Sequence, residues 1–143
     1  MGVAQRIQVG IDCRDPFQLA EFWTAVLDYR RLDAPGGETW EEHSRTNAEE
    51  PGEAWCKIGD PDGVGPTLLF HRTPDPTPGK NRIHLDVRAP QGPGDAMDRV
   101  NTFAERVAEL GGRKVRAVTD DAGHFVVMAD PEENVFCIGA GES

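Results

Sequence analysis

Two side chains that can exchange protons stand two residues apart in the middle of the chain. His84 and Asp86 belong to segment 82–88 (RIHLDVR), in which polar and apolar residues alternate. Alternation with a period of two predicts a β-strand whose polar side chains share one face. On that face Asp86 would accept a hydrogen bond from His84, and His84 would serve as general acid or base near neutral pH. A solvated sheet face, or a histidine with a structural role, explains the same pattern.

A second segment of the same kind stands near the start of the chain. Residues 6–12 (RIQVGID) alternate in the same way, and in both places a turn signal and a helical pattern follow. When the two segments are aligned, Gln8 corresponds to His84. A fold made of two copies of one unit usually has its working site between the copies, so we expect Gln8 and His84 to meet there.

A helix start follows the first segment. Asp15 is of the N-cap type, and Pro16 fits the first helical position, where its missing N–H costs nothing. Apolar residues at steps of three and four then predict an amphipathic helix that packs on a sheet; they are Leu19, Phe22, Trp23, Val26 and Leu27. The polar stretch 33–53 holds an interrupted strand around Trp40 or a loop that covers a cleft. Residues 54–59 and 66–73 are predicted strands, joined by a turn at 60–63.

The second half repeats this plan after a proline-rich linker at 74–81. The strand 82–88 is followed by a turn at 90–94 and by a helix that begins before Met97 and ends at Gly111. Strands are predicted at 113–118, 125–128 and 135–138. Each half is therefore βαβββ, and the fold class is α+β. We expect a single domain over 1–143, built from modules 5–73 and 82–140.

Composition narrows the classes of partner. A chain of 143 residues is long enough for one domain with a real core. The net charge of -10 argues against nucleic acid or an anionic membrane as partner; an acidic surface favours a cationic ligand or only keeps the protein soluble. No apolar run approaches the ~20 residues of a membrane span, and the first residues lack a signal peptide's apolar segment. Three cysteines without CxxC spacing make disulfides and a structural zinc site unexpected. We predict a cytoplasmic protein.

The doubled plan resembles the vicinal oxygen chelate superfamily, and most of all its glyoxalase-like domains. The supporting residues are Asp15-Pro16 with Phe22-Trp23, then 80–86 (KNRIHLD), and then the closing stretch 128–138 (MADPEENVFCI). Glu133 departs from the pattern, because that turn usually carries glycine. The resemblance covers almost the whole chain. It implies a curled mixed sheet around a cleft, but the superfamily includes isomerases, lyases, dioxygenases, thiol transferases and plain binding proteins.

The resemblance also implies where a metal would bind. In metal-using members four side chains meet a divalent ion, two from the first strands of the halves and two from the last strands. The first-strand positions here are Gln8 and His84, and Cys137 stands where the second half normally has glutamate. The fourth position falls on Phe70, or on His71 if the register shifts by one; the two cannot both point inward. With His71 the set would hold Zn²⁺ or Ni²⁺; otherwise Cys137 is a small buried apolar residue. The cofactor is therefore none or a divalent metal.

Aromatic residues suggest a small planar or amphipathic ligand. Trp55, Phe70 and Phe125 lie on predicted strands and Trp40 lies in the polar stretch, although core packing is an equal explanation. With Gln8 and Cys137 they form the predicted ligand site. Two functions follow: an isomerase or lyase in which His84 transfers a proton, and a non-catalytic binding protein of the bleomycin-resistance type. Dimers are common in the resembling families, and by that analogy we expect a homodimer.

Overall fold

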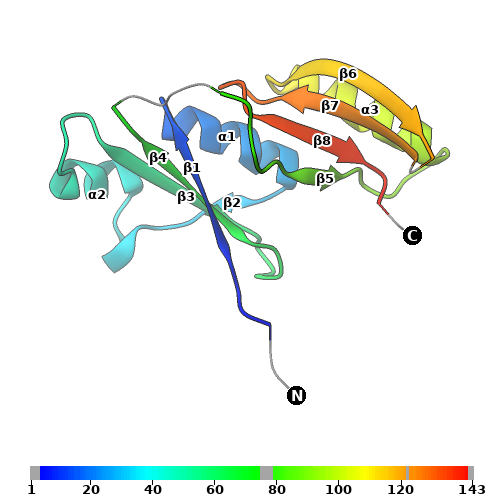
Figure 1. Cartoon of the computed structure of the whole chain (residues 1–143). Helices are drawn as coiled ribbons and strands as arrows, with labels where there is room; N and C mark the ends of the chain where they lie inside the picture. Colours follow the sequence, from blue (N-terminus) through cyan, green and yellow to red (C-terminus); the bar gives the residue numbers. More distant parts are fainter. Residues whose placement is uncertain (1–3, 75–78, 122, 142–143) are drawn as a thin grey trace. The chain divides into compact units, whose positions relative to one another are not determined.

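The chain forms two units, residues 1–78 and 79–143, and each unit has a four-stranded mixed sheet with a helix packed on it (Figure 1). The structure is a computed structural model that describes residues 4–74, 79–121 and 123–141. The α+β class and the two modules of the predicted order are confirmed. The boundary between units falls within the predicted linker 74–81, of which residues 75–78 lie outside the described part. That the two modules make one domain stays a prediction.

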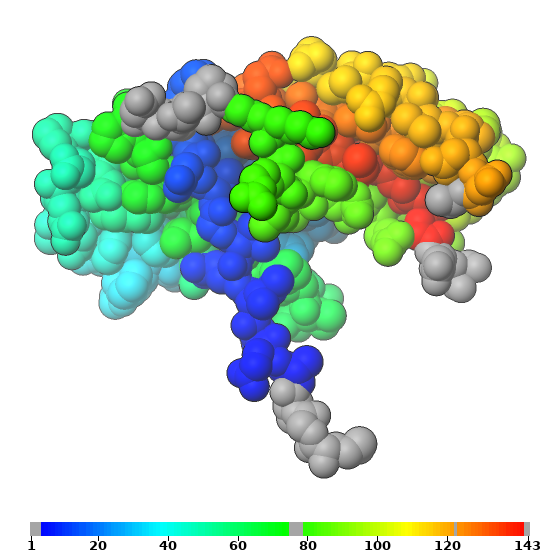
Figure 2. Space-filling view, in the orientation of Figure 1, coloured from blue at the N-terminus to red at the C-terminus, as the bar shows by residue number. Residues whose placement is uncertain are grey.

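The first unit contains the edge-to-edge order β1-β4-β3-β2. Strand β1 pairs parallel with β4, and the other neighbours are antiparallel. Residues 4–7, predicted in part as strand, instead form an extended arm beyond the sheet (Figure 2, dark blue). The elements are β1 (Gln8–Cys13), α1 (Pro16–Leu27), β2 (Arg30–Arg31), a 3₁₀ turn (Pro35–Gly37), α2 (Trp40–Asn47), β3 (Ala54–Gly59) and β4 (Thr67–Arg72).

Helix α1 begins where the sequence predicts. The Asp15 side chain accepts hydrogen bonds from the backbone N–H groups of residues 17 and 18, and Pro16 occupies the first turn. The helix buries Leu19, Phe22, Trp23 and Val26, and the sheet residues Cys56, Ile58, Leu68 and Phe70 are equally buried. Full burial of each large apolar side chain contributes about 1.5–3 kcal/mol. This packing leaves the other face of the first sheet free of α1.

The polar stretch 33–53 forms a helix, so the predicted interrupted strand around Trp40 is wrong. Thr39 and Glu42 form a capping box, in which each side chain accepts from the other residue's backbone N–H. This T-x-x-E pattern is a helix-start signal that the strand interpretation overlooked. Ser44 Oγ accepts a hydrogen bond from the backbone N–H of Trp55 at 2.9 Å. Helix α2 thus satisfies a donor of β3 that the short strand β2 does not reach.

The second unit has the strand order β5-β8-β7-β6, with β5 parallel to β8. Its elements are β5 (Asp86–Arg88), α3 (Ala96–Glu109), β6 (Arg113–Asp120), β7 (Gly123–Ala129) and β8 (Val135–Gly139). Helix α3 starts with a second capping box, Asp95 and Asp98, and it buries Val100, Ala104 and Val107. Strand β5 is shorter than the predicted 82–88, so His84 precedes the strand. Within the described ranges no helix is both long and apolar enough to span a bilayer.

The turn between β7 and β8 explains the unusual Glu133. Asp130 is buried, and its carboxylate accepts hydrogen bonds from the backbone N–H groups of Glu132 and Asn134 and from the Asn134 side chain. The turn requires a residue in the left-handed backbone region, and Glu133 adopts this conformation with φ 69°. A residue with a Cβ pays about 1–2 kcal/mol for that conformation, which glycine adopts freely.

Glu133→Gly removes the strain of the left-handed residue, but glycine also makes the unfolded chain more flexible, which costs part of that gain. We therefore expect a net rise of about 0.5–1 kcal/mol in the free energy of unfolding. Urea unfolding measures the change. The exposed ion pair of Glu133 with Arg113 is also lost, so Arg113→Ala, expected within about 0.5 kcal/mol of wild type, is the control. A destabilised glycine variant contradicts the assignment of strain to this turn.

Candidate functional site

The second sheet has one face against α3 and one face turned away from it. Side chains alternate along the strands, and the strand register aligns them across the sheet. Asp86 of β5 lies opposite Cys137 of β8, Cys137 lies opposite Val127 of β7, and Val127 lies opposite Arg116 of β6. We call the surface that carries this row the open face of the second unit. Phe125 and Arg88 share it by the same alternation.

Three metal-ligating side chains converge on this open face. His84 Nε2 lies 3.5 Å from Asp86 Oδ1, and donor atoms of His84, Asp86 and Cys137 lie within 4.8 Å of one another. The His84 and Asp86 side chains are 52% and 68% exposed, while Cys137 is half-buried. The predicted acid–base pair is thus brought together, and the thiol completes a set of three different donors.

The electrostatics of Cys137 follow from its neighbours. Burial raises the pKa of its thiol above the ordinary value, and the nearby Asp86 carboxylate raises it further. The Arg116 guanidinium acts in the opposite direction but does not outweigh them. Without a cation beside it, Cys137 is therefore a neutral thiol at neutral pH.

The β1–β4 register of the first unit changes the predicted fourth metal position. Gly10 of β1 lies opposite Leu69 of β4, as Asp86 lies opposite Cys137. The first-unit counterpart of Cys137 is therefore Leu69, rather than either of the two expected positions. Phe70 is fully buried on the face toward α1, and His71 lies on the face that carries Leu69.

The other predicted ligand residues have varied surroundings. In the first unit, the side-chain amide oxygen of Gln8 accepts a hydrogen bond from the Thr67 hydroxyl at 3.0 Å. Trp40 is 8% exposed and its indole N–H donates to the backbone oxygen of Leu32 at 2.8 Å, which suits a structural role. Trp55 is half-buried on the face turned away from α1. That these residues meet those of the second unit at one ligand site stays a prediction.

Two hollows on the first unit lie away from the predicted residues. One, of about 540 Å³, runs along α1 past Phe17 and Arg31, and the other, of about 570 Å³, extends from Phe17 to the α2–β3 connection at Glu53. The Arg31 guanidinium carbon lies 5.1 Å from the centre of the Phe17 ring, and Arg31 also pairs with Glu41 at 3.3 Å. These contacts hold the helices beside the sheet edge.

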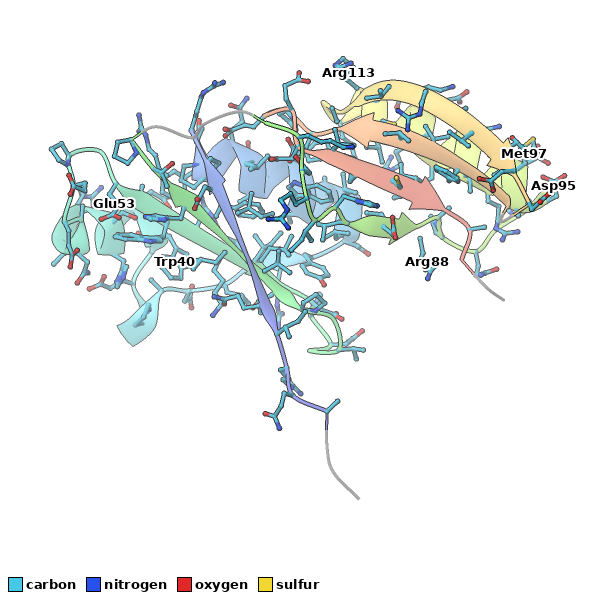
Figure 3. The ribbon with its side chains drawn as sticks, viewed as in Figure 1. Trp40, Glu53, Arg88, Asp95, Met97 and Arg113 are labelled. Atoms are coloured by element: carbon cyan, nitrogen blue, oxygen red, sulfur yellow. The ribbon has the colours of Figure 1, made fainter. Side chains whose placement is uncertain are left out.

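Sequence reasoning did not foresee one cluster of contacts, and it did not name Asp12, Glu53 or His43, which take part in them, as site residues. On the first sheet, His71 contacts Glu53, Asp12 and Trp55, while His43 packs edge-on against Trp40 and Trp55. Asp12 lies four residues after Gln8 in the alternating segment 6–12, so the sequence already predicts that both side chains share one face of the strand. The position of Glu53 could not, because it depends on where α2 ends and β3 begins (Figure 3).

Comparison with known proteins assigns the family. The family model described as Glyoxalase-like domain matches residues 8–139, nearly the entire chain. The chain belongs to this glyoxalase-like family. The resemblance to the vicinal oxygen chelate superfamily is thereby confirmed. No curated protein matches the chain.

Solved structures show the same fold at low sequence identity. The fosfomycin resistance protein FosX from Mesorhizobium loti has a TM-score of 0.65 and 14% identity, over 99% of this chain and 94% of that one. A FosX variant from Listeria monocytogenes, in complex with Mn(II) and 1S,2S-dihydroxypropylphosphonic acid, has a TM-score of 0.67 and 11% identity, over 99% and 95%. A glyoxalase/bleomycin resistance protein/dioxygenase family enzyme from Burkholderia phytofirmans has a TM-score of 0.63 and 15% identity, over 92% and 94%.

The likeness to these structures shows the fold, and it leaves the finer expectations as they were. The isomerase or lyase activity, the bleomycin-resistance type, the homodimer, the exclusion of nucleic acid and the cytoplasmic location all stay predictions. This chain's own residues must therefore indicate its function.

If His84 serves a ligand rather than the fold, its removal should leave stability unchanged. We expect His84→Ala to change the free energy of unfolding by less than about 0.5 kcal/mol, as is usual for an exposed side chain. Phe70→Ala, in the core of the first unit, should cost about 3–5 kcal/mol. Urea unfolding of both variants tests this, and a loss above about 1 kcal/mol in His84→Ala would assign the histidine a structural role.

Proposed function

We propose that this chain binds a small oxygen-bearing molecule through a divalent metal ion held by His84, Asp86 and Cys137. The observation that supports the proposal is the convergence of imidazole, carboxylate and thiol donors within 4.8 Å of one another. Strand pairing produces it, because Asp86 and Cys137 lie opposite each other and His84 precedes β5 by two residues.

The donor set fits a borderline, thiophilic ion such as Zn²⁺. Imidazole and thiolate are ligands that zinc favours, whereas Mn²⁺ favours oxygen donors. The Listeria FosX structure contains Mn(II), so the cysteine here predicts a different preference. Three protein ligands are typical of catalytic zinc sites, which keep a position for water or substrate. A bound ion of this kind supplies a Lewis acid that polarises a carbonyl or phosphoryl oxygen.

Two arginines define the class of ligand. Arg116 lies in the row of Asp86 and Cys137, and Arg88 follows Asp86 on β5 (Figure 3). A guanidinium binds carboxylate, phosphate and phosphonate groups through paired hydrogen bonds. We therefore assign the ligand to small molecules that carry an anionic oxygen group. The phosphonate bound by Listeria FosX is of this class and supports the assignment by analogy.

The test of the metal site is the metal content of protein purified without a His tag. We expect about one equivalent of Zn²⁺ or Ni²⁺ in the wild type, and a loss of at least tenfold in metal affinity in His84→Ala and Cys137→Ser, because each removes one of three ligands. Plasma mass spectrometry measures the content. Asp86→Asn should weaken metal binding as well, and Asp62→Asn, which alters an exposed aspartate of the first unit, is its control. Retention of the ion in Cys137→Ser with the wild-type affinity would refute the ligand set.

The same imidazole supports a second function, which is proton transfer in an isomerase or lyase. The 3.5 Å approach of Asp86 to His84 Nε2 favours it, since the carboxylate would orient the ring. A nitrogen lone pair that binds a metal is not available to a proton, so the two roles compete for His84. Cys137 distinguishes the two functions, because it takes part in metal binding but not in proton transfer.

We use fosfomycin, a small phosphonate, as the probe for both functions. If the metal binds the ligand, the ligand-induced rise in Tm should disappear in Cys137→Ser and in His84→Ala alike. If His84 transfers a proton, phosphorus NMR should show turnover that survives in Cys137→Ser and is lost at least about 100-fold in His84→Ala. Binding without turnover in the wild type would identify a non-catalytic protein of the bleomycin-resistance type.

A further inference from the structure

The first unit carries a row of interacting side chains that the proposed function does not use. Asp12 of β1, His71 of β4 and Trp55 of β3 lie opposite one another on the face turned away from α1. The Trp55 indole stacks on the His71 imidazole, with ring centres 5.3 Å apart and planes within 1° of parallel. The same indole meets His43 of α2 edge-on, with ring centres 6.1 Å apart. Stacking therefore fixes the plane of the His71 ring.

One nitrogen of that ring is held by a carboxylate. His71 Nε2 lies 2.7 Å from Glu53 Oε2, and the Glu53 side chain is only 14% exposed. The other carboxylate oxygen of Glu53 accepts the backbone N–H of Glu49 at 2.9 Å. That bond, followed by the bond with His71, holds the pKa of Glu53 below its usual value. Glu53 is thus a carboxylate at neutral pH, and Nε2 of His71 must donate a proton to it.

The other nitrogen of the ring then presents a lone pair to a second carboxylate. His71 Nδ1 lies 3.8 Å from Asp12 Oδ1, which is too far for a hydrogen bond. A neutral imidazole that donates from Nε2 has an acceptor at Nδ1, so a cation between Nδ1 and the Asp12 carboxylate would pair with both. Two donors on one tetrahedral zinc ion lie about 3.4 Å apart, so a movement of less than about 0.5 Å by the exposed Asp12 carboxylate would admit such an ion.

We propose that His71 Nδ1 and Asp12 Oδ1 form a second divalent cation site, of the class that takes Zn²⁺ or Ni²⁺. Glu53 is its positioning residue: metal-binding histidines commonly donate their second N–H to a carboxylate, which fixes the tautomer and orients the ring. Asp12 is 70% exposed on an edge strand, so its carboxylate is free to adjust to an ion. Water or an oxygen of a bound anion completes the coordination. This site is weaker than a three-ligand site and is independent of His84, Asp86 and Cys137.

The experiment uses the full chain with the His84→Ala and Cys137→Ser substitutions together, which leave only Asp86 of the other proposed site. Calorimetric titration with Ni²⁺ should show one site in this background. Adding Asp12→Asn should weaken it at least tenfold, and adding Glu53→Gln should weaken it by about 10–100-fold. Adding Asp62→Asn, which alters an exposed aspartate on the β3–β4 turn, should leave the affinity unchanged. Ni²⁺ should also quench the fluorescence of Trp55, and Trp55→Phe should remove that component.

Nitrogen NMR of the histidines separates the proposed site from an ion pair. Zn²⁺ should shift the Nδ1 resonance of His71, and Nε2 should keep its proton when the ion binds. The absence of Ni²⁺ binding in the background with both His84→Ala and Cys137→Ser would overturn the site, and protonation of both ring nitrogens would then identify an imidazolium between two carboxylates. Urea unfolding confirms that each variant is folded. If the second unit binds no metal but the site at His71 and Asp12 does, the proposed function fails and this inference stands.

Discussion

The parallel pairing of the first and last strand in each unit determines which side chains can meet on its free face. In the second unit this pairing sets Asp86 beside Cys137, and in the first it sets Gly10 beside Leu69 and Asp12 beside His71. A shift of one residue in either register would exchange the free face for the helix-packed core. The core opposes such a shift, because Phe70 and Ile138 are fully buried on the opposite face. Apolar burial under the helices therefore maintains the polar clusters above the sheets.

The two units use one architecture with different chemistry. Where the second unit has a histidine before its first strand and a thiol on its last strand, the first unit has Gln8 and Leu69 at the corresponding positions. The histidine of β4, His71, lies two residues after Leu69 on the same face, where it faces Asp12. A repeat preserves backbone positions and facial alternation, but each position is free to change its side chain. The ligating groups of one half do not predict those of the other.

Most of the fold could be predicted from the sequence, because its signals are local. Asp15-Pro16, the apolar spacing of α1 and the alternation at 6–12 and 82–88 each report on a few neighbouring residues, and the elements follow at those places. Helix α2 was missed because its polar composition gives no apolar periodicity, although Thr39 and Glu42 carried the capping signal. The meeting of His84 with Asp86 could be predicted from their spacing. The contacts of Glu53 with His71 and of Asp86 with Cys137 could not, because strand register depends on the whole core.

An aspartate on an edge strand is common to both polar clusters, and it creates the same physical problem in each. Asp86 adds negative charge beside a half-buried thiol and raises the pKa of that thiol. Asp12 adds negative charge beside an imidazole whose other nitrogen is already held by Glu53. Neither carboxylate is matched by a cationic side chain at hydrogen-bonding distance among the described contacts, in a chain whose net charge is -10. A cation would stabilise both arrangements, since it would pair with the carboxylate and accept the lone pair of the neighbouring sulfur or nitrogen. The edge position gives each aspartate the freedom to move onto the ion, while the sheet keeps its partner in place.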